Sequence, residues 1–345
     1  MNIKKLKLKE SSSIKEALEV IGFERVRLGI VVSSDDKFLG IISDSNIRKA
    51  LVSGFSINDS IKEIYTKNPI TISPKTSRKK LLELSSKTDI YDFPVLDDNG
   101  RLLAIKSIAS VLNEKHKNKI ILMAGGLGTR LAPLTNYTPK PMLKVGKKPI
   151  LETIINRFSN QGFEDFILCV NYKRKIIEDY FKDGTKFNVN ISYVREKKKL
   201  GTAGALSLLD QDFKESFIVM NADILTDLDF TELLKAHKKS GALMTVCLRE
   251  FSQQIPYGVI ETKKGFVKDI KEKPEQKFLI SAGIYVIENE VLSFLNKNEY
   301  LDMPNLIEKL VKLNERNVFS YIISDYWIDI GRLSEYKKAN EEFVL

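Results

Sequence analysis

Histidine and cysteine are scarce in this sequence of 345 residues, which holds two of each. His116 and His237 are too few to build a histidine-rich metal centre, and they leave a Ser-His-Asp triad little to work with. Cys169 and Cys247 both stand in apolar strand-like runs, where we expect a buried, inert thiol rather than a metal ligand. The sequence therefore argues against histidine-based and thiol-based metal chemistry.

Long apolar runs are also absent. No stretch of 18 or more apolar residues occurs, and the N-terminal segment MNIKKLKLKE carries charges where a signal peptide needs an apolar core. We therefore expect neither a membrane span nor export, and we predict a cytoplasmic protein without a membrane partner. The apolar content of 43% is ordinary for a globular chain.

The net charge of +10 is not gathered into a stripe that would bind nucleic acid. Residues 1–118 hold 21 basic and 15 acidic side chains, and the rest of the chain holds 34 and 30. No basic segment interleaved with aromatic residues stands out. A solvated surface with a site for phosphate-rich small molecules explains this charge more simply than a nucleic-acid partner does.

The N-terminal third contains an internal repeat, and the length of the chain favours two domains. Residues 28–51 and 91–112 share one plan, an apolar strand, a polar turn, a second strand and a helix. Ser13 and Glu16 form a capping box that opens a helix before the first unit. The plan resembles a tandem CBS pair (a Bateman module), an α+β module that binds nucleotides. The resemblance covers residues 1–115, with repeats at about 8–58 and 62–114.

The CBS resemblance implies a single ligand site. The family's motif is complete in repeat one as G-I-I-S-D-S-N, which implies a nucleotide held by Ser43, Asp44 and Asn46. Repeat two has Ala104 and Ser110 where the motif needs a glycine and a final amide or acid. A structural alternative stays open, because serine and aspartate at this place also cap a helix.

The pattern changes after a short charged connector, NEKHKNK at 113–119. Over residues 119–345, apolar strand-like runs alternate with amphipathic stretches. This alternation predicts an α/β, Rossmann-like domain with a mixed, mostly parallel sheet. Ligands of such sheets gather at the carboxyl ends of the strands.

A glycine-rich loop directly follows the first of these strands, KIILMA. Gly125, Gly126 and Gly128 leave backbone N–H groups open to a phosphate chain, and Arg130 adds a charged, bidentate donor. The loop is neither G-x-G-x-x-G nor a Walker A motif, which weakens the dehydrogenase and P-loop interpretations. A tight turn without function remains the structural alternative.

The loop and the segment T-P-K-P-M that follows it resemble the signature of the nucleoside triphosphate sugar transferases, G-G-x-G-T-R-L…K-P-M. In that family the arginine and the lysine, here Arg130 and Lys140, contact the triphosphate or the leaving pyrophosphate. Fixed cations aimed at a leaving group act mainly in the transition state. The prolines that flank Lys140 hold it stiffly, as positioning requires.

The resemblance extends to the nucleoside. L-G-T-A-G-A-L at 200–206 matches the family element that borders it, and Glu196 stands upstream beyond three lysines that lengthen the loop. An ordinary glycine-opened helix is the alternative for this segment, and a solvated loop is the alternative for the lysines. The residues implied to bind the nucleotide are Gly125, Gly126, Gly128, Thr129, Arg130, Lys140, Glu196, Gly201, Thr202, Ala203 and Asn221.

Two aspartates are implied to hold Mg²⁺. Asp223 ends the run FIVMNAD, and Asp329 stands in Y-W-I-D-I-G, in the places of the family's N-x-D and W-x-D-x-G. Two carboxylates suffice for Mg²⁺ when phosphate oxygens and water complete its shell. Either aspartate alone would more often cap a turn, but their occurrence together with the glycine loop favours the metal.

Sugar-phosphate binding is implied for three short elements that match the family's Y-G, E-K-P and A-G-I-Y. By this resemblance Glu272 binds sugar hydroxyls and Lys273 binds the sugar phosphate. Without this resemblance, the segment KDIKEKPEQK at 268–277 would be interpreted as an exposed charged loop. The implied residues are Tyr257, Gly258, Glu272, Lys273 and Gly283.

The resemblance implies in-line attack of a sugar 1-phosphate oxygen on the α-phosphorus of a nucleoside triphosphate (NTP), with release of pyrophosphate. Arg130, Lys140, Asp223 and Lys273 would be catalytic, acting by positioning and charge neutralisation with Mg²⁺. The order of a CBS pair before the transferase domain resembles the guanylyltransferases that make GDP-glucosamine from GTP and glucosamine 1-phosphate for legionaminic acid synthesis.

Two other functions stay open. No single residue distinguishes guanine from thymine, so a dTTP- or other NTP-dependent hexose-1-phosphate nucleotidyltransferase is an alternative. A catalytically inert, nucleotide-sensing regulator is another, although a binding-only protein has no need for the two aspartates, Asp223 and Asp329. A regulatory nucleotide at the CBS pair and a homo-oligomer are further open questions.

Overall fold

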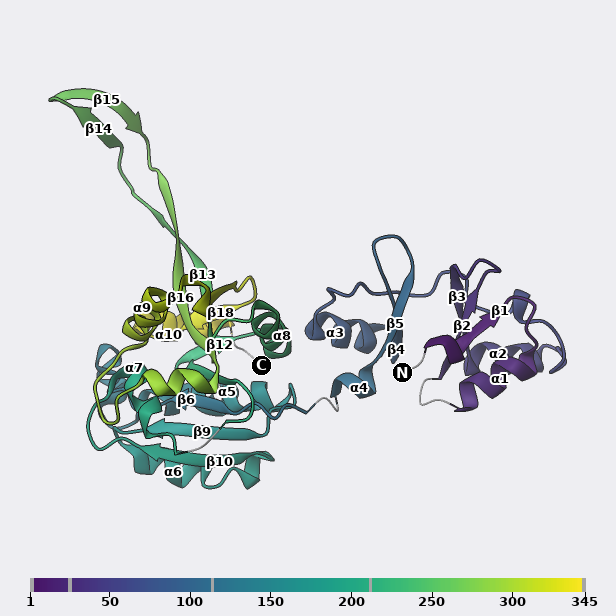
Figure 1. The fold of residues 1–345 in the computed structure, drawn as a ribbon, viewed down its shortest axis with the longest axis horizontal. Helices are drawn as coiled ribbons and strands as arrows, with labels where there is room; N and C mark the ends of the chain where they lie inside the picture. The colour runs from purple at the N-terminus through teal and green to yellow at the C-terminus, as the bar shows by residue number, and fades with distance from the viewer. Residues whose placement is uncertain (1–2, 24–26, 113–114, 211–212, 343–345) are drawn as a thin grey trace. The chain divides into compact units, whose positions relative to one another are not determined.

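The computed structural model describes residues 3–23, 27–112, 115–210 and 213–342. The chain divides into two compact units, Met1–Glu114 and Lys115–Leu345, each of which is described by itself (Figure 1). The division falls inside the charged connector 113–119, of which residues 113–114 lie outside the described residues. No described helix is both long and apolar enough to cross a membrane.

The first repeat of the N-terminal unit is a three-stranded sheet packed against helices. Strand β1 runs parallel to β2, and β2 pairs antiparallel with β3. The expected capping box opens α1, because the backbone N–H of Ser13 donates to Glu16 Oε2 at 2.7 Å. The elements are η1 (Ile3–Leu6), β1 (Lys7–Lys9), α1 (Ile14–Phe23), β2 (Leu28–Val32), β3 (Phe38–Ser43), α2 (Asp44–Val52) and η2 (Ile61–Glu63).

The second repeat follows the same plan in a shorter form. A parallel bridge between Ile72 and Val95 takes the place of the β1–β2 pairing. Leu102 and Ile105 pack against the buried face of β2, so the two repeats share an apolar cluster. The elements are α3 (Arg78–Thr88), β4 (Asp92–Leu96), β5 (Leu102–Ser107) and α4 (Ile108–Leu112). The predicted α+β repeat architecture is confirmed.

A seven-stranded mixed sheet forms the centre of the C-terminal unit. Its strand order is β10-β9-β6-β11-β16-β13-β17, in which four neighbouring pairs are parallel and the two pairs made by β16 are antiparallel. The strands are β6 (Ile120–Met123), β9 (Asp165–Val170), β10 (Asn190–Arg195), β11 (Phe217–Asn221), β13 (Met244–Gln254), β16 (Glu275–Ile287) and β17 (Val318–Ile322). The predicted Rossmann-like domain with a mixed, mostly parallel sheet is confirmed.

Alternate residues of the central strands serve two cores, one on each face of the sheet. Ile120 and Leu122 pack in the cluster that holds α5 and α8, whereas Ile121 packs in the cluster that holds α9. The helices are α5 (Ile150–Ser159), α6 (Arg174–Phe181), α7 (Gly201–Gly204), α8 (Phe230–Ser240), α9 (Met303–Leu313) and α10 (Leu333–Glu342). Cys169 and Cys247 are buried in these cores, and burial raises the pKa of both thiols, as expected for inert cysteines.

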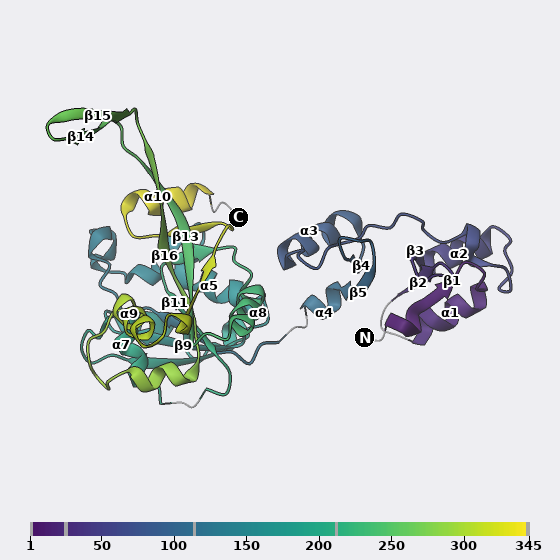
Figure 2. The ribbon, with the colours of Figure 1, turned by 45° about the horizontal axis from the view of Figure 1, so that its top comes forward.

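Among the residues of this unit that the structure describes, three small two-stranded sheets accompany the large one. Strand β7 (Lys144–Val145) pairs with β8 (Lys148–Pro149), and β12 (Ile224–Thr226) pairs with β18 (Trp327–Asp329). The third pair, β14 (Val259–Lys263) and β15 (Phe266–Lys271), continues the long ribbon of β13 and β16. Both views show this pair at the far end of that ribbon, away from the seven-stranded sheet (Figures 1 and 2).

Candidate active site

The carboxyl ends of four neighbouring parallel strands deliver the implied nucleotide site. Gly125 follows β6, Asn171 follows β9, Glu196 follows β10, and Asn221 ends β11. Because these strands are adjacent and parallel, the segments after them share one edge of the sheet. The sequence motifs therefore come together on the side where α/β sheets bind their ligands.

The glycine loop is closely packed at Gly125 and open at Gly126. A Cβ atom on Gly125 would lie 2.7 Å from Glu196 Oε1, and a Cβ atom on Gly126 would meet nothing within 4 Å. Gly128 has a φ of 65°, and Thr135 donates to its carbonyl oxygen at 2.9 Å. Thr129 and Arg130 are exposed. The loop therefore leaves its backbone accessible at Gly126 and exposes Arg130, next to the part that packs against Glu196.

Asp223 and Asp329 lie together because β12 and β18 pair. Ile224 is the register partner of Asp329, and the backbone N–H of Ile330 donates to the carbonyl oxygen of Asp223 at 3.0 Å. Lys140 donates from Nζ to Asp223 Oδ2, and the same ammonium lies 3.8 Å from Asp329 Oδ1. The ammonium of Lys140, which follows the glycine loop in the sequence, therefore lies close to both carboxylates.

The surroundings of Asp329 disfavour its ionisation. Burial, and then the neighbouring charge of Asp223, raise the pKa of Asp329 to about 6, against the opposing effects of Lys140 and Arg130. Glu335 of α10 also contributes to this raised pKa. Asp329, whose ionisation is disfavoured by burial and by its neighbour Asp223, shares one lysine with that neighbour, and such a site would gain from a second cation.

The donor set fits Mg²⁺. Asp223 Oδ1 and Asp329 Oδ1 are buried and have no hydrogen-bond partner among the described residues. Within the described part of the chain, no group of three or more His, Cys, Asp or Glu side chains is arranged to hold a metal, so these carboxylates would act as a pair. Two carboxylate oxygens with phosphate and water are a common Mg²⁺ environment.

Glu196 is buried beside the glycine loop, and burial raises its pKa. Its Oε2 accepts the backbone N–H of Leu200 at 3.2 Å, which ties it to the L-G-T-A-G-A-L segment. Lys197, Lys198 and Lys199 between them are exposed, as the solvated-loop alternative expects.

The glycines of L-G-T-A-G-A-L have a packing role in this structure. A Cβ atom on Gly201 would lie 2.5 Å from the carbonyl oxygen of Leu301, and one on Gly204 would collide with that of Glu299. The hydroxyl of Thr202 accepts the backbone N–H of Met303 at 2.8 Å. The contact of Gly201, Thr202 and Ala203 with a nucleotide stays a prediction, whereas their contact with residues 299–303 is observed.

Of the five residues implied to bind the sugar phosphate, Gly283 lies in the body of the domain. A Cβ atom on Gly283 would stand 2.8 Å from Asn221 Nδ2 and 2.6 Å from Ile224 Cδ1, and Ile224 is the register partner of Asp329. The other four gather at the junction between β13–β16 and β14–β15, where a Cβ atom on Gly258 would meet Glu272 Oε2 at 3.1 Å. Every residue of β14 and β15 is exposed, and the described contacts do not bring Lys273 to Asp223 or Asp329.

The CBS motif residues have local partners. Ser43 caps α2 and forms a capping box with Asn46, and Asn46 Nδ2 donates to Thr66 Oγ1 at 3.2 Å. Arg48 donates to Asp44 at 2.6 Å on an exposed surface. A Cβ atom on Gly40 would collide with the carbonyl oxygen of Thr66. These contacts show the helix-capping role, and ligand binding by the same residues stays a prediction.

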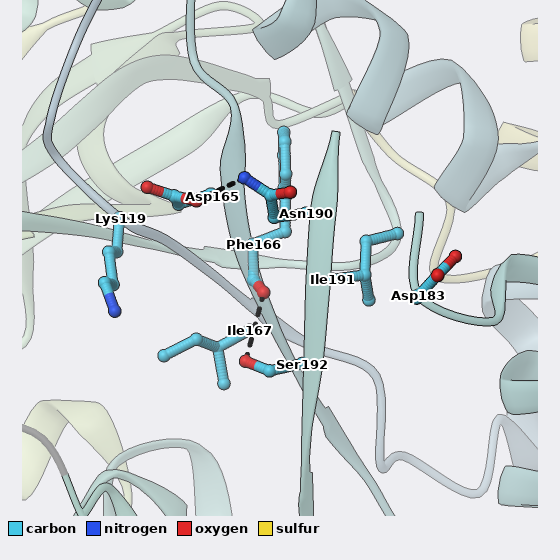
Figure 3. A pocket seen from close by; sticks show the side chains of 8 residues that line it. All are labelled: Lys119, Asp165, Phe166, Ile167, Asp183, Asn190, Ile191 and Ser192. Carbon is cyan, nitrogen blue, oxygen red and sulfur yellow. Dashed lines mark hydrogen bonds between the residues drawn. The ribbon is translucent and has the colours of Figure 1, made fainter. Parts of the chain in front are cut away.

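A cavity of about 260 Å³ is lined mainly by residues of β9 and β10, apart from the implied catalytic residues. Asn190 donates to Asp165 there at 2.9 Å, and Ser192 donates to the carbonyl oxygen of Phe166 at 3.4 Å (Figure 3). Asp165 and Asn190 are the first residues of their strands, so the cavity lies toward the amino ends of the sheet. It contains none of the residues that the motifs single out.

Three residues near the site went unnoticed in the sequence. Asn171 contacts the loop, since a Cβ atom on Gly125 would lie 3.2 Å from Asn171 Cβ. Glu335 has a buried, unpartnered Oε2 near Asp329, and Asp302 bonds Thr202. A polar residue at the end of an apolar strand could have signalled Asn171, but no local pattern marks Glu335 or Asp302.

Comparison with known families agrees with this geometry. Residues 119–344 match the family described as Nucleotidyl transferase, and residues 1–53 and 61–112 match the CBS domain. The solved structures that resemble the chain include a candidate glucose-1-phosphate thymidylyltransferase of Bacillus anthracis, with a TM-score of 0.54 and 23% identity over 65% of this chain and 94% of that one. HddC of Yersinia pseudotuberculosis has a TM-score of 0.50 and 25% identity over 66% and 99%. These likenesses concern the fold.

Curated relatives point to the same family. A UTP–glucose-1-phosphate uridylyltransferase of Synechocystis is 32% identical over 242 residues, which are 64% of this chain and 62% of the relative. A mannose-1-phosphate guanyltransferase of Yarrowia lipolytica is 34% identical over 230 residues, which are 63% and 62%. The chain thus spans about three fifths of the length of these relatives.

Proposed function

The chain belongs to the Nucleotidyl transferase family, and on that premise we propose that it is a sugar-1-phosphate nucleotidyltransferase. It would join a nucleoside monophosphate from an NTP to a sugar 1-phosphate and release pyrophosphate. The observation that carries the proposal is the meeting of Lys140, Asp223 and Asp329 beside an open glycine loop. Cation, paired carboxylates and open backbone N–H groups are what the handling of a triphosphate requires.

Arg130 and Lys140 would act on the triphosphate. Arg130 is exposed at the loop and can hold phosphate oxygens with two parallel N–H donors. Lys140 can exchange its carboxylate partner for a phosphate oxygen, because its ammonium already lies beside the two carboxylates that would hold the metal. Both charges would stabilise the pyrophosphate as it leaves.

Asp223 and Asp329 would hold Mg²⁺ through the oxygens that have no hydrogen-bond partner. When bound, Mg²⁺ supplies charge neutralisation on the reacting phosphates. The sugar phosphate is largely ionised near neutral pH and needs no general base. His116 stacks on Phe163 and His237 is buried, and neither is among the residues that form this site.

Lys273 and Glu272 would bind the sugar phosphate by family resemblance. They stand on the ribbon that carries β14 and β15, together with Tyr257 and Gly258. For these residues to take part in the reaction, the ribbon and the aspartate pair must both contact the same bound sugar phosphate.

We propose GTP and glucosamine 1-phosphate as the substrates, giving GDP-glucosamine for legionaminic acid synthesis. The order of a CBS pair before the transferase domain supports this choice by resemblance, and guanyltransferases stand among the relatives. A uridylyltransferase stands among them too, so the base is open to test.

A panel of four triphosphates against several sugar 1-phosphates, followed by pyrophosphate release and product mass, tests both levels of the proposal. We expect GTP with glucosamine 1-phosphate to give the highest kcat/KM. Better use of dTTP, UTP or a neutral hexose phosphate would overturn the substrate assignment alone. Absence of pyrophosphate with every pair would overturn the transferase itself and favour a nucleotide-sensing regulator.

A further inference from the structure

Asp302 occupies the N-cap position of α9 but makes no side-chain bond to that helix. Its Oδ1 instead accepts the backbone N–H of Thr202 at 3.0 Å, at the start of α7. Its Oδ2 accepts the hydroxyl of Tyr300 at 2.6 Å. The aspartate therefore serves an element that is distant in the sequence.

Thr202 makes the reciprocal contact. Its Oγ1 accepts the backbone N–H of Met303 at 2.8 Å, so each of the two side chains satisfies a donor at the start of the other's helix. Backbone bonds join the same two segments, because Leu301 N–H donates to Leu200 and Ala203 N–H donates to Leu301, both at 2.9 Å.

The glycines complete the fit between these segments. Gly201 and Gly204 approach the carbonyl oxygens of Leu301 and Glu299 so closely that a Cβ atom would not fit at either place. Leu200 also donates its backbone N–H to Glu196, which lies against the glycine loop. Displacement of residues 200–204 would thus reach the phosphate-binding side of the site.

We propose that Asp302 is a positioning residue for the nucleotide, because it sets the backbone of Leu200–Gly204 through Thr202. The inference rests on the proposed function, in which this segment borders the nucleoside. Bonds from Tyr300 and Thr202 hold the pKa of Asp302 below its usual value, so the acceptor is charged at neutral pH. Charge-assisted hydrogen bonds are stronger than neutral ones, so the charged Asp302 restrains the backbone of Leu200–Gly204 more strongly than a neutral acceptor would.

The test compares Asp302→Ala with Asp302→Asn in the full chain. We expect Asp302→Ala to raise the KM for the NTP about tenfold, while kcat and the KM for the sugar phosphate change by less than about threefold. Asp302→Asn keeps an acceptor at Oδ1 and should bring the KM for the NTP back to within about threefold of the wild type.

Asp229→Ala is the matched control. Asp229 is the N-cap of α8 and accepts the backbone N–H of Glu232 at 3.1 Å, so this change also removes an aspartate from the start of a helix, at a place outside the proposed site. It should lower the thermal midpoint without changing the KM for the NTP. Tyr300→Phe is a milder probe of Asp302 and should raise that KM by about twofold.

An unchanged KM for the NTP in both Asp302→Ala and Tyr300→Phe would overturn the proposal and leave Asp302 with a purely structural role. Equal losses in Asp302→Asn and Asp302→Ala would do the same. If Asp302→Ala fails to fold, Tyr300→Phe decides, and an unchanged KM for the NTP in that variant overturns the proposal. Calorimetry of the wild type with the NTP separates the two levels, since a wild type that binds no NTP refutes the proposed function instead.

Discussion

Glu196 lies against Gly125 at the carboxyl edge of the sheet, where a Cβ atom on the glycine would stand 2.7 Å from the carboxylate oxygen. The glutamate is buried, and its other oxygen bonds the backbone of Leu200. The glycine loop and the L-G-T-A-G-A-L segment are therefore in contact through one side chain. Any group added at Gly125 must move that side chain or the loop.

Gly125→Ala should lower kcat/KM about tenfold or more and destabilise the fold by about 1–3 kcal/mol, because the new methyl group overpacks against Glu196 and Asn171. Gly126→Ala is the comparison for stability, since its Cβ atom would meet nothing within 4 Å. Steady-state kinetics and thermal unfolding of both variants provide the check. Equal stability of the two variants would contradict the packing argument.

Asp223→Asn and Asp329→Asn should each lower turnover by about a hundredfold or more while the fold stays intact, because each removes a carboxylate from the proposed metal pair. Mn²⁺ binding followed by electron paramagnetic resonance should weaken in both variants. Near-normal turnover and Mn²⁺ affinity in both, at saturating Mg²⁺, would remove these residues from a metal site. Circular dichroism controls for folding.

The stability of the fold should fall below about pH 6.5 on account of His237. Its ring is buried between Thr245, 2.8 Å from Nδ1, and Glu288, 2.9 Å from Nε2, and burial lowers its pKa against the raising effect of Glu288. The unfolded chain therefore takes up a proton at a higher pH than the folded chain. Stability is full above the unfolded pKa and is lost as the pH falls toward the folded pKa, by up to about 1.4 kcal/mol per pH unit.

Urea unfolding of the wild type and of His237→Gln between pH 5 and 7.5 isolates this contribution. The variant should be less stable at pH 7.5 and should show a flatter decline below pH 6.5, because glutamine does not titrate. Parallel declines in the two proteins would show that other groups carry the pH dependence.

A purine nucleotide should bind the N-terminal unit and change activity from outside the active site, if the CBS resemblance extends to ligand binding. Asp44→Ala is the cleaner probe, because Asp44 is exposed and pairs only with Arg48 among the described contacts, whereas Ser43 and Asn46 hold the start of α2. The variant should weaken nucleotide binding in calorimetry and blunt its effect on kcat/KM. By linkage, the substrates should shift the affinity of this nucleotide.

Asp98→Ala, in an exposed turn of repeat two, is the control and should behave as the wild type. A regulatory nucleotide that binds equally well to all three proteins would place its site elsewhere. No binding at all would leave the unit with a structural role.

Local patterns in the sequence were enough for the outline of this protein. Alternating strands and helices, the S-x-x-E cap at Ser13 and the apolar runs around Cys169 and Cys247 depend on neighbouring residues and on burial, and the structure confirms each of them. The glycine loop and the two aspartates stood out by residue type and spacing. Their roles with a nucleotide and Mg²⁺ stay predictions.

The tertiary structure alone determined which residues of distant segments are in contact. Asp223 and Asp329 are neighbours only because β12 pairs with β18, and no local pattern encodes that register. The glycines at 201 and 204 stand in a segment that the family resemblance places beside the nucleoside, and only the structure shows that their Cβ positions face residues 299–301. Asp302 carries no signal of its own, since its partner Thr202 lies in another segment. Periodicity and turn chemistry are short-range properties, whereas a site depends on contacts between segments that only folding brings together.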